Sequence, residues 1–247
     1  MAIEGPLTGK RALVTGASGA IGSAIARRLA RDGAHVLLHA NARPDAVHAL
    51  AAEIAGAGGS AECWPFDLGS DQACAAACTK MLESGAVQII VNNAGVHDDA
   101  VFPGMKAAQW YRVIDVSLHG FFRVTQPLLL PMLRTRWGRV INVSSVAAIM
   151  GNRGQVNYAA AKGALNSATK ALALEVASRG VTANAIAPGI IASPMIEGAF
   201  DAEAIARLVP ARRAGTPAEV AALARFLCSD EAGYINGQVI SINGAMA

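Results

Sequence analysis

Short apolar runs alternate along the chain with longer Ala- and Leu-rich stretches whose apolar positions recur at helical spacing. This alternation predicts a parallel β-sheet with helices on both faces, because strands covered on two sides are apolar throughout. We expect strands at residues 11–15, 35–39, 61–66, 88–92, 139–144, 182–187 and 239–242. We expect helices near residues 21–32, 45–56, 70–84, 108–135, 156–178 and 217–229.

No Pro- or Ser-rich linker and no change in composition divides the 247 residues. We therefore predict a single α/β domain, doubly wound, with a seven-stranded parallel sheet. Right-handed crossovers place the carboxyl ends of all strands at one edge, where ligands bind. The C-terminal run 233–247 is apolar and ends in a strand, so we place it at an edge of the sheet, available for subunit contact.

The segment 189–216 contains no predicted strand, and a connection of this length in a compact domain is usually functional. We interpret it as a lid over the substrate, with a short helix near 202–208; an ordinary surface excursion is the alternative. It contains the apolar residues Pro194, Met195, Ile196, Phe200 and Leu208.

Composition narrows the classes of function. Apolar residues make up 53% of the chain and charged residues 16%, which suits a large core and argues against disorder. With a net charge of +3 and no long run of Lys or Arg, binding to nucleic acid has little support. We see neither an apolar leader near the start nor an apolar stretch long enough to span a membrane, and we expect a cytoplasmic protein.

Four cysteines are present, and two of them, Cys74 and Cys78, lie one helical turn apart. This spacing is compatible with a metal pair, but no second pair lies nearby. We favour buried small residues on an Ala-rich helix and expect no metal site.

A glycine-rich turn, Thr15–Gly22, follows the first predicted strand and begins the first helix. Its glycines let the backbone approach a pyrophosphate, and the helix N-terminus supplies N–H donors, so the turn predicts a dinucleotide site.

The second strand ends at Ala40 without the acid that holds the ribose 2′-OH of NAD. Arg43 follows, where it can reach a 2′-phosphate, and Ser18 and Asn41 can donate hydrogen bonds. We therefore favour NADP; a solvated loop charge is the alternative for Arg43.

Tyr158 and Lys162 are four residues apart in a predicted helix, so their side chains share one face. A neighbouring cation lowers the pKa of a Tyr from its usual ~10. Lowering it to near 7 takes about 4 kcal/mol, at 1.36 kcal/mol per pKa unit, which we assign to Lys162 and a bound pyridinium together. Such a phenol exchanges a proton near neutral pH, as carbonyl reduction requires. Ser144 and Ser145 end a predicted strand just upstream.

Together these motifs resemble the short-chain dehydrogenases/reductases, over about Lys10 to Met246, and most of all their 3-oxoacyl-acyl-carrier-protein reductases. The resemblance implies a Rossmann fold and assigns the catalytic roles. Ser145 binds the substrate carbonyl oxygen, Tyr158 donates the proton to the developing alkoxide, and Lys162 holds the nicotinamide ribose. Ser144 is the competing serine, but the spacing in the family favours Ser145.

The resemblance also implies contacts with the cofactor. Asp67 matches the residue that binds the adenine amine, Asn93 supports the central sheet, and Gly95 lets the backbone lie against the cofactor. Ile190 or Ile191 is expected to bind the carboxamide through backbone groups, and Ser193 stands where relatives often have Thr. The expected cofactor-binding residues are Gly16, Ser18, Gly19, Ala20, Ile21, Gly22, Asn41, Arg43, Asp67, Leu68, Asn93, Ala94, Gly95, Tyr158, Lys162, Pro188, Gly189, Ile191 and Ser193.

Three positions depart from the family pattern. Ala20 replaces the middle glycine of the turn and asks for a negative φ or a slightly wider spacing from the phosphate. Gly19 stands where many NADP-using relatives carry a basic residue. Ser117 replaces the Asn that holds a water in a proton relay to the Lys, and its side chain is shorter. The activity is expected to survive, because Ser145, Tyr158 and Lys162 are all present.

The resemblance implies that Arg136 and Arg179 dock an acidic acyl carrier protein, with Arg134 and Arg139 adding positive charge. Solvated helix-end charges are the alternative. The loop 151–155 is expected to line the acyl channel. The family also implies a homotetramer, formed by the long helices and the C-terminal segments.

We therefore predict an NADPH-dependent 3-oxoacyl thioester reductase acting on carrier-bound chains. The segments 97–102 and 116–122 resemble a ketoreductase branch of aryl-polyene pigment pathways. Fatty-acid synthesis, polyketide synthesis and reduction of acetoacetyl-CoA or another small ketone are alternatives within the class. A non-catalytic partner subunit that binds the cofactor is the alternative from another class.

Overall fold

The computed structural model describes residues 3–193 and 201–247 of the chain. Seven strands form one parallel sheet in the order β3-β2-β1-β4-β5-β6-β7. Strand order reverses between β1 and β4, which is where a doubly wound sheet binds its ligands. The strands are β1 (Arg11–Val14), β2 (His35–Ala40), β3 (Ser60–Pro65), β4 (Ile89–Asn92), β5 (Gly138–Val143), β6 (Val181–Pro188) and β7 (Val239–Ile242).

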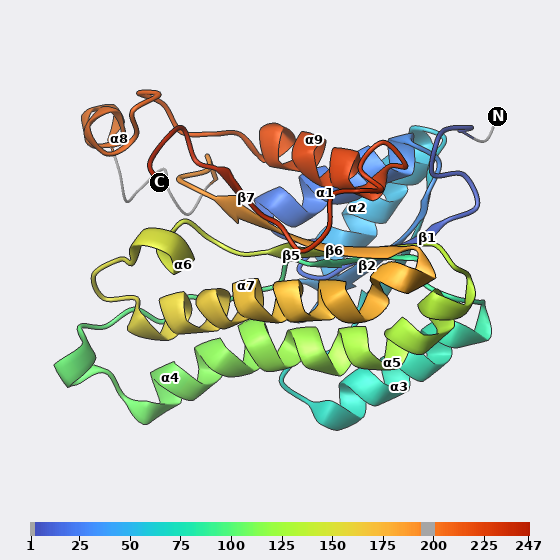
Figure 1. Ribbon diagram of the computed structural model, residues 1–247, viewed down its shortest axis with the longest axis horizontal. Helices are drawn as coiled ribbons and strands as arrows, with labels where there is room; N and C mark the ends of the chain where they lie inside the picture. The colour runs from blue at the N-terminus through green and yellow to red at the C-terminus, as the bar shows by residue number, and fades with distance from the viewer. Residues whose placement is uncertain (1–2, 194–200) are drawn as a thin grey trace.

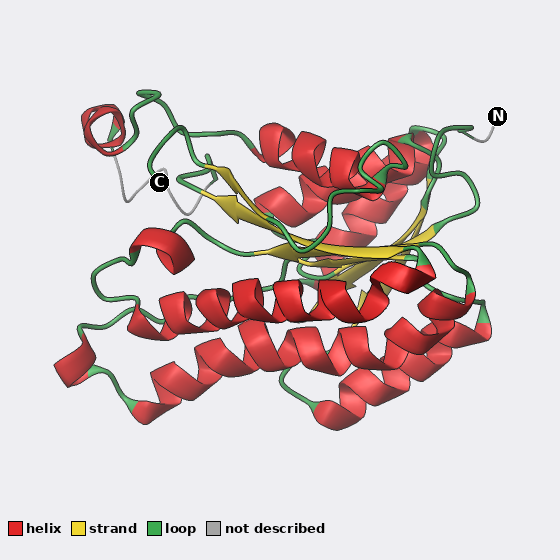
Figure 2. Cartoon of the chain, in the orientation of Figure 1, coloured by secondary structure: helices red, strands yellow, loops and turns green. Residues whose placement is uncertain are grey.

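Helices cover both faces of this sheet (Figure 1). Figure 2 shows the strands in yellow between two layers of red helices. One layer contains α1 (Ala20–Arg31), α2 (Pro44–Gly56) and α9 (Pro217–Cys228). The other contains α3 (Asp71–Glu83), α4 (Ala107–Ile114), α5 (Gly120–Arg134) and α7 (Val156–Val176).

Each face of the sheet has its own apolar core. Successive strand side chains point to opposite faces, so Leu13 and Val14 of β1 belong to different clusters. Val14 packs in the core with Ile25 and Leu29 of α1, whereas Leu13 packs in the core with Leu128 of α5. The predicted fold class, a single-domain Rossmann fold with seven parallel strands, is confirmed.

The predicted elements are found with ends that differ by one or two residues. The long helix expected near 108–135 is divided: a π-helical turn, η2 (Asp115–His119), joins α4 to α5. Three short elements are additional: η1 (Phe102–Gly104), α6 (Ala147–Met150) and η3 (Ala177–Arg179). Pieces of three or four residues are too short to show a hydrophobic period, so the sequence pattern does not predict them.

The predicted lid is only partly described. Its helix is α8 (Ala202–Leu208), and Ile191 pairs with Gly215 across the segment. Residues 194–200, which include Pro194, Met195, Ile196 and Phe200, lie outside the described residues. β7 is the edge strand of the sheet, as expected. Within the described ranges, no helix has both the length and the apolar character needed to cross a membrane.

Candidate active site

The glycine-rich turn after β1 leads directly into α1. Gly16 has a φ of 65°, and a Cβ there would lie 2.9 Å from the Ala94 Cα. At Gly22 a Cβ would collide with the Gly16 carbonyl oxygen, so both positions require glycine. Ala20 is the first residue of α1 and has a negative φ. Its methyl group is therefore accommodated without backbone strain.

The N-terminus of α1 is suited to an anion. Its N-cap, Gly19, has no side chain to bind the first amides, and the first turn contains no acidic residue. The free N–H groups and the helix dipole therefore face the loop with a partial positive charge. A pyrophosphate is the expected ligand of such a terminus.

Thr15 and Asn93 fasten the turn to the neighbouring strand β4. The Thr15 hydroxyl accepts hydrogen bonds from the backbone N–H groups of Asn93 and Ala94, both at 3.0 Å. The Asn93 side chain donates to the carbonyl oxygens of Thr15 (2.9 Å) and Gly16 (3.2 Å). Asn93 thus holds the central sheet together at the switch point, in the position expected for it.

His39, near the end of β2, is a buried polar residue beneath the same turn that sequence reasoning missed. Its Nδ1 accepts from the Gly16 N–H (3.1 Å), and its Nε2 lies 3.0 Å from the Phe66 carbonyl oxygen. Because an amide N–H only donates and a carbonyl only accepts, the ring is neutral with its proton on Nε2. Burial lowers the pKa of His39 to about 4. A polar side chain directly after the apolar run Val36–Leu38 of the strand HVLLHA was the available signal.

The end of β2 lacks an acidic side chain, which is the feature from which the sequence predicted NADP. Ala40 is buried there, and the next side chain, Asn41, donates to the Asp67 carboxylate at 3.1 Å. Asp67 also accepts from the Gly69 N–H at 2.9 Å. Arg43 is exposed at the N-cap of α2 and forms no ion pair with any described residue. Its guanidinium is therefore free to bind an anion at this edge.

The two serines after β5 have different surroundings. Ser144 is buried and donates to the Lys162 carbonyl oxygen at 3.2 Å. Ser145 accepts from the Ala147 N–H at 3.1 Å and lies close enough to the Tyr158 phenol to lower its pKa. The geometry therefore brings Ser145, rather than Ser144, to Tyr158, as the spacing in the family favoured.

Tyr158 and Lys162 share one face of α7, and the Lys162 Nζ lies 5.8 Å from the Tyr158 ring centroid. Lys162 is buried and donates to the Val143 carbonyl oxygen at 2.7 Å. An ammonium has three donors, so two N–H bonds remain for a ribose or a water. Burial lowers the pKa of Lys162 to about 8.

The expectation of a lowered Tyr158 pKa is not met by the chain alone. Burial raises the pKa of Tyr158 to about 12, and the hydrogen bond with Ser145 opposes this rise. The Lys162 ammonium donates to a carbonyl rather than to the phenol, so it does not stabilise the phenolate directly. The lowering must come from charge that a bound cofactor brings.

Ser117 lies on the π-helical turn η2 and is 3% exposed. Its hydroxyl has no hydrogen-bond partner among the described residues. A buried, unpartnered hydroxyl is costly, and an ordered water commonly satisfies it. The hydroxyl therefore fits the site of a bound water, at the position where the family resemblance implied an Asn.

The segment after β6 offers backbone groups near the predicted nicotinamide site. Gly215 bonds to the C=O of Ile190 (2.9 Å) and to the N–H of Ala192 (2.8 Å). This bridge leaves out the N–H and C=O of Ile191, so Ile191 is better placed than Ile190 for a carboxamide. Ser193 is partly exposed two residues further on.

A buried polar network fixes α7 against the sheet beneath the site. Asn92 of β4 donates to the Asn142 Oδ1 (2.9 Å) and to the Thr125 Oγ1 (3.0 Å). Asn142 donates in turn to the Thr169 Oγ1 at 2.8 Å. Because every link is buried and paired, the network sets the position of α7 relative to β4 and β5.

The arginines expected to dock a carrier protein lie far from Tyr158. Arg136 and Arg179 are both exposed and adjacent, since Gly180 contacts the Arg136 backbone. Arg139 is different: it is buried, donates to the Ser229 carbonyl oxygen and pairs with Asp230 at 3.2 Å. The expectation that Arg139 adds surface charge is therefore wrong, because this guanidinium is used inside the fold.

The two cysteines that lie one helical turn apart have the buried surroundings of structural residues. Cys74 and Cys78 are buried on α3, and burial raises the pKa of both thiols. Among the described residues, no group of His, Cys, Asp or Glu is arranged to hold a metal ion.

Comparison with known proteins gives a consistent result. The family model described as short chain dehydrogenase matches residues 10–204. Nodulation protein G of Rhizobium sp. (strain N33) is 44% identical over 98% of both chains. The 3-oxoacyl-acyl-carrier-protein reductase FabG of Vibrio cholerae is 43% identical over 97% of this chain and 98% of its own. A crystal structure of a putative gluconate dehydrogenase from Agrobacterium tumefaciens superposes with a TM-score of 0.94 at 33% identity, covering 99% of this chain and 98% of that one.

Proposed function

Because the chain belongs to the short chain dehydrogenase family, we propose that it reduces a 3-oxoacyl thioester to the 3-hydroxyacyl thioester with NADPH. The observation that carries this proposal is the convergence of Ser145, Tyr158 and Lys162 beside the uncapped N-terminus of α1. Ser145 lies close enough to Tyr158 to lower its pKa, and Lys162 lies on the same helix face as Tyr158. This set provides a hydroxyl donor, a proton donor and a fixed cation at one place.

The residues present fit a nicotinamide dinucleotide. The amides of the first turn of α1 would hold its pyrophosphate, and the free N–H bonds of Lys162 would hold the ribose of the nicotinamide. Asp67 would bind the adenine amine, and the Ile191 backbone the carboxamide. When bound, the reduced cofactor supplies a hydride to the substrate carbonyl carbon.

The side chains then stabilise the negative charge that develops on the substrate carbonyl oxygen. The Ser145 hydroxyl accepts from the Ala147 N–H, and when substrate binds its own hydrogen turns from Tyr158 to the substrate oxygen. Tyr158 gives its proton to the same oxygen as negative charge develops. Lys162 keeps a positive charge nearby, and a water between Ser117 and Lys162 returns a proton from solvent.

The preference for NADPH rests on the end of β2. An acid at Ala40 or Asn41 would repel a 2′-phosphate, and neither residue is acidic. Arg43 is exposed and unpaired among the described residues, so it can reach that phosphate.

An acyl substrate is supported by apolar side chains around the predicted site. The 97–102 segment lies against the 151–155 loop, because the Ala100 N–H donates to the Gly154 carbonyl oxygen at 2.9 Å. Five large apolar side chains on these segments and their neighbours are exposed: Val101, Phe102, Ile149, Met150 and Val156. Exposed apolar groups clustered beside a catalytic site favour binding of an apolar chain. Relatives with about 40% identity are named as reductases of carrier-bound 3-oxoacyl chains.

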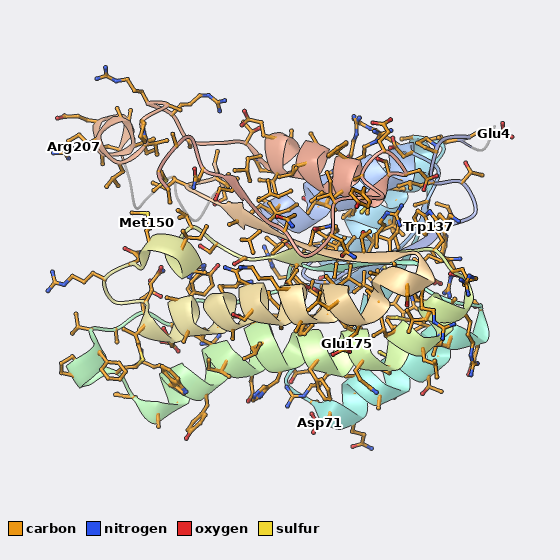
Figure 3. The ribbon with its side chains drawn as sticks, in the orientation of Figure 1. Glu4, Asp71, Trp137, Met150, Glu175 and Arg207 are labelled. Carbon is orange, nitrogen blue, oxygen red and sulfur yellow. The ribbon has the colours of Figure 1, made fainter. Side chains whose placement is uncertain are left out.

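Carrier docking at Arg136 and Arg179 would require a second copy of the chain. Tyr158 and Arg179 lie near opposite ends of α7, which at ~1.5 Å per residue separates them by roughly 30 Å. Figure 3 shows Trp137, the neighbour of Arg136, at the end of the molecule opposite Met150. A carrier bound at this pair would therefore serve the site of an adjoining subunit, in accordance with the proposed homotetramer.

Two other functions are retained as alternatives to reduction of a carrier-bound 3-oxoacyl chain. Reduction of acetoacetyl-CoA would use the same side chains on a shorter acyl group. A partner subunit without activity is favoured by Ser117 and Ala20, yet Ala20 fits α1 without strain. An aryl-polyene role is proposed from the 97–102 and 116–122 segments alone.

The test is NADPH oxidation with a panel of 3-oxoacyl chains of increasing length, each presented on an acyl carrier protein, on CoA and as a pantetheine thioester. The proposal predicts turnover of 3-oxoacyl thioesters, with the highest kcat/KM on the carrier. Absence of turnover with every 3-oxoacyl thioester, at confirmed NADPH binding, would contradict it.

A further inference from the structure

The imidazole of His97 covers the ring of Tyr158. Their ring centroids are 4.2 Å apart, and the rings are inclined by 33°. His97 belongs to the segment that follows β4, whereas Tyr158 stands in the first turn of α7. The stack therefore joins two segments of the chain that meet only in the folded protein, directly at the predicted proton donor.

The orientation of His97 is set by the Gln155 amide. Gln155 accepts a hydrogen bond from the Asn152 amide at 2.9 Å through its Oε1. Its Nε2 donates to the Asp99 Oδ2 at 2.8 Å and lies 3.3 Å from the His97 Nδ1. An amide nitrogen only donates, so Nδ1 must be the acceptor. The imidazole is therefore neutral, with its proton on Nε2.

The segment that holds His97 is itself fastened to α7. Asn157, which is fully buried, donates to the carbonyl oxygens of Asp98 (2.9 Å) and Gln109 (3.2 Å). Its Oδ1 accepts from the Tyr158 N–H at 2.8 Å. One side chain thus fixes both the backbone of Tyr158 and the backbone next to His97, so the two rings have little freedom to separate.

The charges around the two rings are few. Asp99 and Lys162 act on His97 in opposite directions, and burial, the largest influence, lowers the His97 pKa. Tyr158 faces Lys162 on α7, Ser145 after β5 and Asp99 on the segment of His97. The remaining carboxylate of that segment, Asp98, is paired with Arg112 at 3.5 Å. His97 therefore meets Tyr158 as an uncharged ring near neutral pH.

We propose that His97 is a positioning residue for Tyr158: its ring, although 39% exposed itself, is the wall that covers one side of the phenol ring, holds it in place and limits its contact with water. This role deepens the proposed function, on which it rests, since it concerns the side chain that would donate the proton. A ring that excludes water keeps the phenol protonated until the reaction begins. It also restricts the phenol to one orientation, which proton transfer requires.

Two substitutions distinguish the effect of the His97 ring itself from the effect of its ring nitrogens. His97→Ala removes the wall, so water reaches Tyr158 and its pKa falls from about 12 toward the ordinary ~10. His97→Phe keeps a ring against the phenol, and the Tyr158 pKa stays high. His48→Ala is the matched control, because His48 is exposed on α2.

The readout is tyrosinate absorbance of the free protein, which does not depend on the substrate. The chain has three Tyr, and Tyr111 and Tyr234 are exposed. The Tyr158 signal is therefore measured as the difference between each protein and the same protein carrying Tyr158→Phe. At about pH 11 this difference should be small in the wild type, in His97→Phe and in His48→Ala, because the Tyr158 pKa is about 12. It should be clearly larger in His97→Ala, with the fold checked by circular dichroism.

The kinetic readout is the alkaline limb of kcat/KM for NADPH oxidation. It should move to lower pH in His97→Ala and be restored by His97→Phe. An unchanged Tyr158 tyrosinate signal in His97→Ala, or the same acid shift in His97→Phe, would overturn the proposal. If no substrate is turned over, the proposed function fails, while the tyrosinate signal still decides the role of His97.

Discussion

Ser117 and Lys162 face each other across Gly95. A Cβ added to Gly95 would lie 3.4 Å from the Lys162 Nζ and 3.5 Å from the Ser117 Oγ. The hydroxyl has no partner among the described residues, and the ammonium has one, Val143. A single water at this point could bind both groups, and it would restore the link that the family makes with a longer Asn.

Replacement of Ser117 measures what this hydroxyl contributes. We expect Ser117→Ala to lower kcat by about tenfold or less, equal to roughly 1.4 kcal/mol, the net worth of one ordinary hydrogen bond. Ser117→Asn should be tolerated. Steady-state rates of both variants decide; a hundredfold loss in Ser117→Ala would mean that the hydroxyl itself carries the proton.

Arg43 should determine the choice of cofactor. The wild type is expected to favour NADPH over NADH in kcat/KM, and Arg43→Ala should reduce that ratio by about tenfold to a hundredfold, the worth of one charged hydrogen bond. Arg28→Ala is the control, because Arg28 is exposed on α1 without an ion pair among the described residues. A preference for NADH, or an unchanged ratio in Arg43→Ala, would disprove the assignment.

Acid should destabilise the protein through His39. Its folded pKa of about 4 lies below the ordinary 6.5, so the unfolded chain binds the extra proton first as the pH falls. Stability therefore decreases between about pH 6.5 and 4, by roughly 3 kcal/mol at 1.36 kcal/mol per unit, and this loss levels off below 4. His39→Asn should remove this slope in urea unfolding measured across the window, whereas an equal slope in both proteins would refute the role.

Assembly should depend on an apolar surface of the long helices. Tyr111, Phe122, Leu130 and Leu174 are exposed on α4, α5 and α7, and Leu174 is 84% exposed. We expect a tetramer by light scattering at micromolar concentration and a smaller species in Leu174→Asp. His48→Asp, which changes an exposed side chain on α2, outside both the long helices and the C-terminal segment, should leave the mass unchanged. A wild-type monomer would contradict the proposal.

The sequence was sufficient to predict features that depend on residues close together in the chain. The alternation of apolar runs predicted every strand of the sheet, and the four-residue spacing placed Tyr158 and Lys162 on one helix face. Ser145 could be chosen over Ser144 only through the family resemblance, yet their different hydrogen bonds agree with that choice.

Sequence was insufficient where a side chain acts through distant partners. His39 bonds to Gly16 and Phe66, which are 23 and 27 residues away, and no spacing indicates that arrangement. His97 meets Tyr158 only because separate segments fold together, and Arg139 is buried by Ser229 and Asp230 from much later in the chain. The pKa of Tyr158 also depends on burial, which the pair of residues by itself does not reveal.

The central claim is that Tyr158 donates the proton during reduction of a 3-oxoacyl thioester. The most direct measurement is the single-turnover rate of NADPH oxidation by the wild type and by Tyr158→Phe, with NADPH affinity measured by fluorescence. We predict that Tyr158→Phe loses about a hundredfold or more of the rate, as expected for a general acid, while binding NADPH nearly as well as the wild type. A near-native rate in Tyr158→Phe would contradict the account, because another group would then supply the proton.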